Sequence, residues 1–233
     1  MNIKNLVSPF LGILMLGFSG CIKPSDYIQK FINEPAIFDY SFSFQPIIET
    51  RYGPFLAPEL FNDTILVLED ILWTNFEINY KQQTNSDLYT ISNLSYQIIS
   101  YSWVKQGAID NTDEYDEPID HVYNEPKRLR NMLFFWFRHK APKGQTYDYE
   151  MLYDPDESSV IPTLYIRAKK TNELTDNDTE VQTCYGFDMS FLENHNSAGT
   201  NEARFNVMYY TGKGETGYQS FNNTPMIWWI STD

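Results

Sequence analysis

The side chains that could carry out catalysis or bind a metal ion are scattered along this sequence. His121, His139 and His195 lie far apart, and none of them is close in sequence to Cys184. Zinc sites and Cys–His pairs show short, regular spacings, which this chain lacks. Residues 211–217, "TGKGETG", do not have the spacing of a phosphate-binding loop, and they follow strand-like residues, so they predict a hairpin turn. The sequence therefore predicts no catalytic residue, no metal site and no cofactor.

Carboxylates are abundant, with 31 acidic against 17 basic residues and a formal net charge of −14. Nucleic-acid binding depends on basic side chains that neutralise phosphates, so this balance argues against a nucleic-acid partner. Acidic side chains are concentrated in residues 107–128. Two interpretations of this segment stay open: a calcium site or a solvated, charged segment. The glycine of an EF-hand loop is missing, which favours solvated charge. The densest basic group, Lys127, Arg128 and Arg130, is expected to pair with this acidic segment.

The first cysteine stands in "LGFSGCIKP", residues 16–24, at the end of an apolar run that follows Lys4. Such a run is typical of a secretory signal peptide and is too short for a membrane-spanning helix. Phe18-Ser19-Gly20-Cys21 resembles the lipobox of bacterial lipoproteins. The resemblance implies that residues 1–20 are removed, that Cys21 is acylated, and that the mature chain is anchored to a lipid bilayer. Cys184 would then have no partner for an intramolecular disulfide.

A second modification motif is the tripeptide Asp63-Thr64-Ile65. It resembles the signal that directs O-glycosylation of exported proteins in Bacteroidota, with Thr64 as the acceptor. The alternative is that Thr64 simply opens a β-strand, as threonine commonly does. Both interpretations stay open.

Aromatic residues make up 16% of the chain, which suits either β-strand cores or a surface that stacks on sugars. The candidate stacking platforms are Trp103, Trp228 and Trp229. Because adjacent strand residues face opposite ways, at most one of Trp228 and Trp229 is expected to be exposed. Trp136 lies in "NMLFFWFRH", where both strand faces are apolar, so we expect it in a buried core strand.

The elements that must position these residues are mainly strands. Ser25 and Pro35 bracket a short predicted helix, and aromatic residues at every even position from 38 to 44 predict a strand with one buried face. Alternating β-branched and aromatic residues predict one or two strands over 64–80 and further strands over 88–104. Five more strands are predicted at 131–139, 162–170, 182–192, 203–212 and 225–231.

The predicted fold is all-β, with a small N-terminal antiparallel barrel or sheet followed by a C-terminal antiparallel β-sandwich. We expect residues 1–20 to be the signal peptide, 21–34 the lipid tether, 35–125 the N-terminal domain and 126–233 the C-terminal domain. The acidic, proline-containing stretch supplies the boundary, because it cannot bury enough apolar surface to fold alone.

Together, the lipobox, "TILVLEDILWTNFEINY", "PTLYIRAKK" and "YGFDMSFL" resemble the NigD-like lipoproteins of Bacteroidota. The resemblance implies an N-terminal OB-like barrel, a C-terminal sandwich and a place in the cell envelope, on the outer membrane. It carries over no catalytic residue. The expected function is that of a non-enzymatic binding or accessory protein. The alternatives are a carbohydrate-binding module and a structural subunit of an outer-membrane assembly, so the expected partners are the bilayer and a glycan or an outer-membrane protein.

Overall fold

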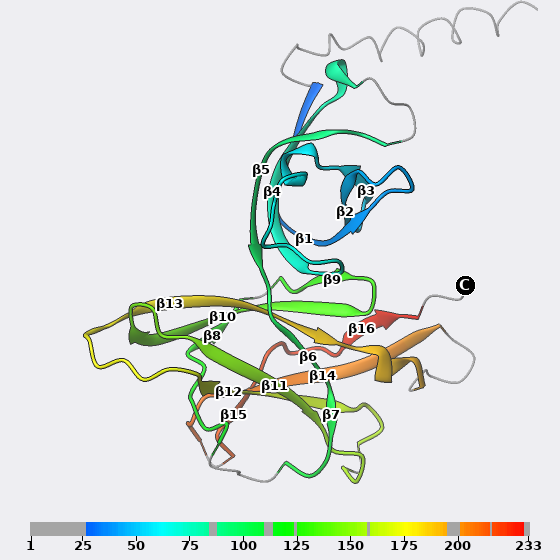
Figure 1. The fold of residues 1–233 in the computed structure, drawn as a ribbon. Helices are drawn as coiled ribbons and strands as arrows, with labels where there is room; N and C mark the ends of the chain where they lie inside the picture. The colour runs from blue at the N-terminus through cyan, green and yellow to red at the C-terminus, as the bar shows by residue number, and fades with distance from the viewer. Residues whose placement is uncertain are drawn as a thin grey trace, which may run out of the picture.

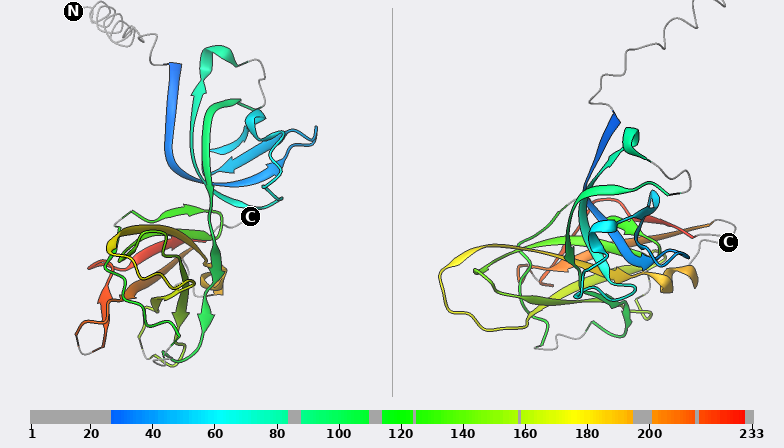
Figure 2. Two further views of the ribbon diagram at one scale, coloured as in Figure 1. Left: turned by 60° about the vertical axis from the view of Figure 1, so that its left-hand side comes forward. Right: turned by 45° about the horizontal axis from the view of Figure 1, so that its top comes forward.

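The computed structural model describes residues 27–83, 88–109, 114–123, 125–157, 159–194, 201–214 and 216–230. It contains two β-sheet bodies, and Figures 1 and 2 show the first body (strands β1–β5) standing on the second (strands β6–β16). The helical elements of the described ranges are short 3-10 turns: η2 (Pro58–Leu60), η3 (Tyr80–Gln82) and η4 (Ser190–Asn194). None of the helices there is long and apolar enough to cross a membrane. The expected all-β class is confirmed.

The first body is one five-stranded sheet in the order β3-β2-β1-β4-β5. Its strands are β1 (Ile28–Tyr40), β2 (Pro46–Thr50), β3 (Gly53–Leu56), β4 (Ile71–Asn79) and β5 (Ile91–Ile98). The sheet curls around buried Phe38, Phe76 and Ile78. A single parallel bridge joins Leu56 to Thr90, beside the start of β5. Among the described residues the edge strands β3 and β5 do not pair with each other, so the sheet does not close into the expected barrel.

The helix expected between Ser25 and Pro35 is wrong, because the chain is in strand β1 from Ile28 onward. Phe31 is buried and stacks on Phe76 of β4 with ring centres 4.6 Å apart, whereas Ile32 is exposed. A helix would have needed both side chains on its buried face. A β-bulge between Phe31 and Glu34 interrupts the pairing of β1 with β4, and Pro35 lies beyond it in register with Trp73.

Two other strand expectations are wrong in their extent. Strand β1 ends at Tyr40, and Phe42 and Phe44 lie in the following turn with their side chains exposed rather than buried. Residues 64–70 form a loop, and β4 begins only at Ile71. In both places apolar residues continue past the point where a neighbouring strand is present to pair with them.

The second body is a sandwich of two sheets. One has the order β6-β13-β10-β8, with β9 also paired to β10, and the other has the order β15-β14-β12-β11-β7, with β16 also paired to β14. The strands are β6 (Tyr101–Trp103), β7 (Lys105–Gln106), β8 (His121–Val122), β9 (Lys127–Leu129), β10 (Met132–Pro142), β11 (Tyr147–Tyr153), β12 (Thr163–Lys170), β13 (Asp178–Asp188), β14 (Glu202–Tyr210), β15 (Tyr218–Ser220) and β16 (Met226–Trp229). Phe135, Phe187 and Phe205 are fully buried between the sheets.

The expected sandwich is confirmed, but its sheets are mixed rather than purely antiparallel. Strand β6 runs parallel to β13, β7 runs parallel to β11, and β12 runs parallel to β14. The first two pairs arise because the chain leaving the first body adds short strands to the edges of both sheets. Parallel pairing of this kind leaves no hairpin signal in the sequence.

The chain passes from one body to the other at residues 99–100. The Ile99 N–H donates to the Ile71 carbonyl at 2.8 Å, and the next carbonyl, that of Ser100, accepts from the Gly186 N–H at 3.0 Å. Strands β6, β7 and β8 therefore belong to the second body, although they precede the expected domain boundary at 125/126. The described parts of the acidic stretch lie in the second body, where they include β8 and the start of β9, so the sheets do not divide there.

An apolar interface joins the two bodies. Its buried residues are Ile37, Ile71, Trp73, Ile99, Leu129, Met132, Phe134 and Cys184. Ion pairs flank it: Lys127 binds Glu34 at 2.9 Å, and Arg130 binds Glu49. The expectation that the basic residues pair with the acidic segment is therefore wrong: the described ion pairs of Lys127 and Arg130 are with the first body, and Arg128 packs on Trp228 of β16.

Candidate functional site

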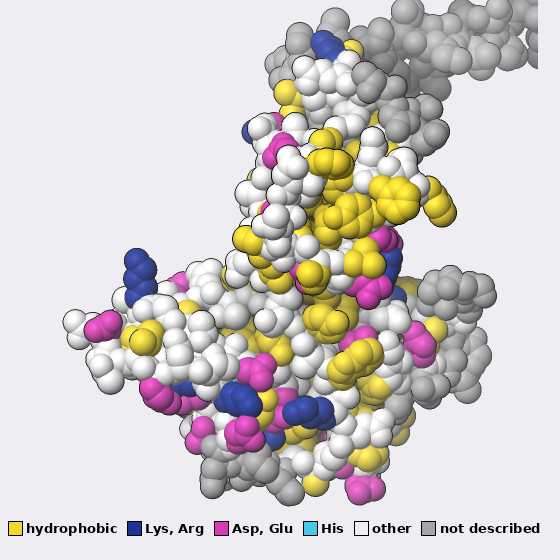
Figure 3. Space-filling view, viewed as in Figure 1, with side chains coloured by type: hydrophobic (Ala, Val, Ile, Leu, Met, Phe, Trp, Pro, Cys, Tyr) yellow, Lys and Arg dark blue, Asp and Glu magenta, His cyan; other side chains and the backbone are white. Residues whose placement is uncertain are grey.

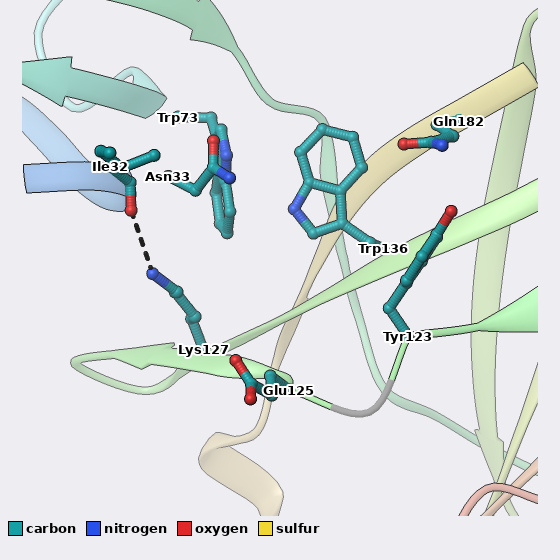
Figure 4. A pocket seen from close by; sticks show the side chains of 8 residues that line it. All are labelled: Ile32, Asn33, Trp73, Tyr123, Glu125, Lys127, Trp136 and Gln182. Atoms are coloured by element: carbon teal, nitrogen blue, oxygen red, sulfur yellow. Dashed lines mark hydrogen bonds between the residues drawn. The ribbon is translucent and has the colours of Figure 1, made fainter.

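A cleft of about 590 Å³ opens where the two bodies meet. The first body contributes Ile32, Asn33 and Trp73 to its lining, and the second contributes Tyr123, Glu125, Lys127, Trp136 and Gln182. Figure 4 shows these side chains gathered around a common space. The combination of aromatic rings with amide and carboxylate groups is typical of a small-molecule site, and such sites often lie between domains.

Two tryptophans form the aromatic part of the cleft. Trp73 extends from β4 and Trp136 from β10, and their rings meet edge to face with centres 5.4 Å apart. Figure 4 shows the nitrogen-bearing edge of Trp136 turned toward Trp73. Trp73 is only 6% exposed, and its buried Nε1–H has no hydrogen-bond partner in the described part of the chain. A buried donor left without an acceptor is costly, so it marks a place where a ligand oxygen would be stabilised.

The polar side chains come from irregular or paired backbone around the tryptophans. Asn33 lies in the β1 bulge with φ of 56°, and its N–H donates to Asn75 Oδ1 at 2.8 Å. The Tyr123 N–H donates to the Trp136 carbonyl at 3.0 Å, which fixes Tyr123 beside that ring. Gln182 projects from β13, where its Nε2 donates to Glu180 at 2.8 Å. The backbone thus holds amide and hydroxyl groups next to the aromatic surface.

The charge of Lys127 is compensated within the cleft wall. Its Nζ donates to Glu34 Oε1 at 2.9 Å and to the Ile32 carbonyl at 3.4 Å, and Arg51 also binds Glu34 at 3.1 Å. Glu125, in contrast, is exposed and has no ion pair with any described residue. The cleft therefore presents no unpaired cation to a ligand.

Of the candidate nucleophiles and bases, Cys184 and His139 are buried and do not line the cleft, whereas His121 is partly exposed and meets the cleft-lining Tyr123 edge to face, with ring centres 5.1 Å apart. Burial raises the pKa of the Cys184 thiol, which keeps it protonated at neutral pH. Burial lowers the pKa of His139 to about 4, so its imidazole is neutral at pH 7. His139 Nδ1 donates to the Pro118 carbonyl at 2.9 Å, which leaves Nε2 to accept from the Tyr149 hydroxyl at 2.8 Å. His139 is thus held inside the second body by its hydrogen bonds, whereas Cys184 belongs to the apolar interface between the bodies.

The structure separates the three tryptophans that the sequence singled out. Trp103 and Trp229 are 64% and 60% exposed, while Trp228 is buried beneath the Arg128 guanidinium, 3.7 Å from its ring centre. The expectation that at most one of Trp228 and Trp229 is exposed is confirmed. None of the three lines the cleft.

Trp136, expected in a buried core strand, is only half-buried. One face of β10 packs into the sandwich core, and the other packs against the first body through Met132 and Phe134. The first body does not extend over Trp136 completely, so the cleft begins there. Sequence analysis did not identify three of the lining residues, Trp73, Tyr123 and Asn33. A signal for Trp73 was present, because Ile71 and Trp73 alternate with the core residue Leu72 on β4 and so form a second apolar face.

Thr64 lies exposed in the loop before β4, so it does not open a strand. Asp63 forms a turn around it, because its Oδ1 accepts from the Ile65 and Leu66 N–H groups at 2.9 and 3.3 Å. The Tyr96 hydroxyl donates to the same carboxylate, which helps to lower the pKa of Asp63. The Thr64 hydroxyl is therefore accessible for modification.

Other expected sites fall outside the described residues: Cys21, His195, Asp110 and Asp113. Within the described ranges no group of three or more His, Cys, Asp or Glu side chains is placed to hold a metal ion.

An apolar surface on the first body is the other prominent feature, and Figure 3 shows it as a concentration of hydrophobic side chains. We call Tyr40, Phe42, Phe44, Ile47, Pro54 and Leu68 the hairpin surface, after the β1–β2 turn that carries two of them. They surround a depression of about 760 Å³ together with Asp39, Ser41 and Leu88. Exposed apolar patches on soluble domains often mark contacts with other molecules.

No protein-family model matches the chain, and no curated protein matches it. Several solved structures match the chain in their fold. An uncharacterized protein from Parabacteroides merdae has 15% identity and a TM-score of 0.69, and the match covers 87% of this chain and all of that one. A NigD-like immunity protein from Bacteroides caccae has 12% identity and a TM-score of 0.53, with 85% and 90% covered. The chain has the NigD-like fold.

A third solved structure, a putative toxin related protein from Parabacteroides distasonis, has 15% identity and a TM-score of 0.60, and the match covers 86% of this chain and 93% of that one. The matches span both β bodies. At these identities they establish the fold alone, and the expected likeness to NigD-like proteins is confirmed at that level.

Proposed function

We propose that this chain is a lipid-anchored, non-catalytic binding protein of the cell envelope, and that its ligand site is the cleft between the two bodies. The observation that carries the proposal is the pairing of Trp73 and Trp136 across the interface, with a buried indole N–H that lacks an acceptor. The interface is apolar and flanked by ion pairs, so the two walls of the cleft are held at a fixed separation. A preformed site of this kind binds without first having to order its own walls.

The non-catalytic role is supported by the state of the reactive groups. The Cys184 thiol is buried and protonated, and His139 is buried and neutral with both ring nitrogens engaged. Neither side chain lines the cleft. The lining residues of the cleft include one carboxylate, Glu125, and no second acidic side chain.

Anchoring is tested by replacing Cys21. We expect the C21A variant to accumulate as an unprocessed precursor and to lose the acylated N-terminal peptide, because the thiol is the acceptor of the lipid and acylation precedes cleavage. Mass spectrometry of membrane-extracted protein measures both changes. The C184A variant is the matched control and should be processed normally. A C21A protein that is cleaved and soluble at normal yield would contradict anchoring.

Binding at the cleft is tested by thermal unfolding of the full chain in a detergent extract of Bacteroidales cell envelopes. A ligand that binds only the folded state raises the melting temperature. We expect the extract to raise it for the wild type and for F42S/F44S, but not for W136A. Phe42 and Phe44 make a suitable control because their exposed side chains contribute little to folding.

A second candidate function is that of an accessory subunit, which the hairpin surface favours. Apolar side chains that stay exposed in the free chain would be covered by a partner protein. In the same experiment this function predicts the opposite pattern, with the shift lost in F42S/F44S and kept in W136A. No shift in any variant would contradict both candidates.

A further inference from the structure

We infer that the cleft binds a neutral saccharide, with a sugar ring stacked on the face of Trp136 and its hydroxyls bonded to Asn33, Gln182 and Glu125. This inference rests on the proposed function and names its ligand class. Trp103, Trp228 and Trp229, the platforms considered from sequence, take no part in it.

The position of Trp136 suits stacking on a sugar. Trp136 is half-buried and meets Trp73 edge to face, and Figure 4 shows its ring between Trp73 and Tyr123, with none of the other drawn lining side chains over the ring face that is turned toward the viewer. The faces of aromatic rings carry partial negative charge, which attracts the polarised C–H groups on one side of a pyranose ring. The edge-to-face contact fixes the ring, so stacking requires little further loss of side-chain freedom.

The polar groups around that face match the equatorial hydroxyls of a sugar. Amides donate and accept, and a carboxylate accepts from two neighbouring hydroxyls, so Asn33, Gln182 and Glu125 together offer both roles. The Trp73 Nε1–H adds a buried donor that lacks an acceptor. A wholly apolar ligand would bury these groups without partners, which is unfavourable.

The charges of the cleft select a neutral sugar over an acidic one. Lys127 is the cation in the lining, and it is already bound to Glu34 at 2.9 Å. Glu125 remains as an exposed carboxylate, and the chain as a whole carries a formal charge of −14. A uronate or sulfate group would therefore meet repulsion with no free cation to compensate it.

The test uses the full chain in detergent micelles, with tryptophan fluorescence titrations against oligosaccharides of mannose, glucose, xylose and N-acetylglucosamine, and against oligogalacturonate as the acidic probe. We expect at least one neutral probe to bind, with affinity about tenfold weaker in W136A. W136F should retain part of that affinity, because a smaller aromatic face remains. N33A and Q182A should each weaken binding, and W103A and W229A should leave it unchanged. Unchanged melting temperatures of the unbound variants establish that each one folds.

Three results would overturn the inference: no neutral probe binding, tighter binding of oligogalacturonate, or binding lost in W103A or W229A but kept in W136A. These outcomes are distinguishable from failure of the proposed function. If the envelope extract stabilises the wild type but not W136A, and none of the saccharide probes binds, the cleft is a binding site for another class of ligand. If the extract is also without effect, the binding function itself is wrong.

Discussion

The R167M variant is expected to lose about 3–5 kcal/mol of unfolding free energy, because it removes one partner from a buried ion pair. Arg167 of β12 lies opposite Glu150 of β11, with Nε to Oε1 at 2.9 Å, and both side chains are 6% exposed. Without Arg167, the buried carboxylate keeps the more exposed Lys105, 3.0 Å from its Oε2. One flexible surface lysine cannot compensate for the desolvation of Glu150.

The double variant E150M/R167M is the matched control for this prediction. It removes both charges and replaces them with apolar side chains, so we expect it to be much closer in stability to the wild type than R167M. Urea unfolding followed by tryptophan fluorescence measures both variants. A loss below about 1 kcal/mol in R167M, or an equal loss in the double variant, would show that this pair is not a stability determinant.

Acidification is expected to destabilise the protein through His139 by about 3 kcal/mol between pH 6.5 and pH 4. Burial lowers the pKa of the folded-state imidazole to about 4, whereas an unfolded chain titrates near 6.5. Between these values the unfolded state binds the extra proton, so stability falls as the pH falls. Well above pH 6.5 the imidazole is neutral in both states, and the contribution is constant. His139 is 1% exposed, so solvent screens this penalty little.

Measuring unfolding free energy at several pH values for the wild type and H139Q isolates this contribution. Glutamine does not titrate but can still bond to Pro118 and Tyr149, so H139Q should show a flatter pH dependence between 6.5 and 5. Carboxylates titrate mainly below that interval and are common to both proteins. Identical slopes for the two proteins would exclude His139 as the source.

Much of the sandwich could be predicted because its strands are long and densely apolar. The expected strands at 131–139, 162–170 and 203–212 correspond closely to β10, β12 and β14. Strand β11 was missed, because Asp148 and Glu150 interrupt its apolar pattern. The structure shows why a charged residue can lie in this buried strand: Glu150 is paired with Arg167 inside the sandwich.

The cleft could not be predicted, because it depends on how two separate sheets face each other. Trp73 and Trp136 belong to different bodies, and nothing in the local pattern of either strand specifies the other. Their outward orientation was readable from strand alternation, since Leu72 and Phe135 face the cores while their neighbours face away. Sequence alternation thus indicates which face needs a partner, but the partner itself is set by tertiary packing.

The placement of β1 in the first sheet has a mechanical consequence. The described chain enters the fold through this thirteen-residue strand, which is paired with β2 on one side and β4 on the other. Tension applied through the residues before Tyr27 acts along the strand axis, so the hydrogen bonds of the β1–β4 ladder are loaded in shear and share the force, instead of opening one at a time from an edge. A chain held at its N-terminus and pulled by cargo bound between its two bodies would therefore resist extension at the point where the load enters.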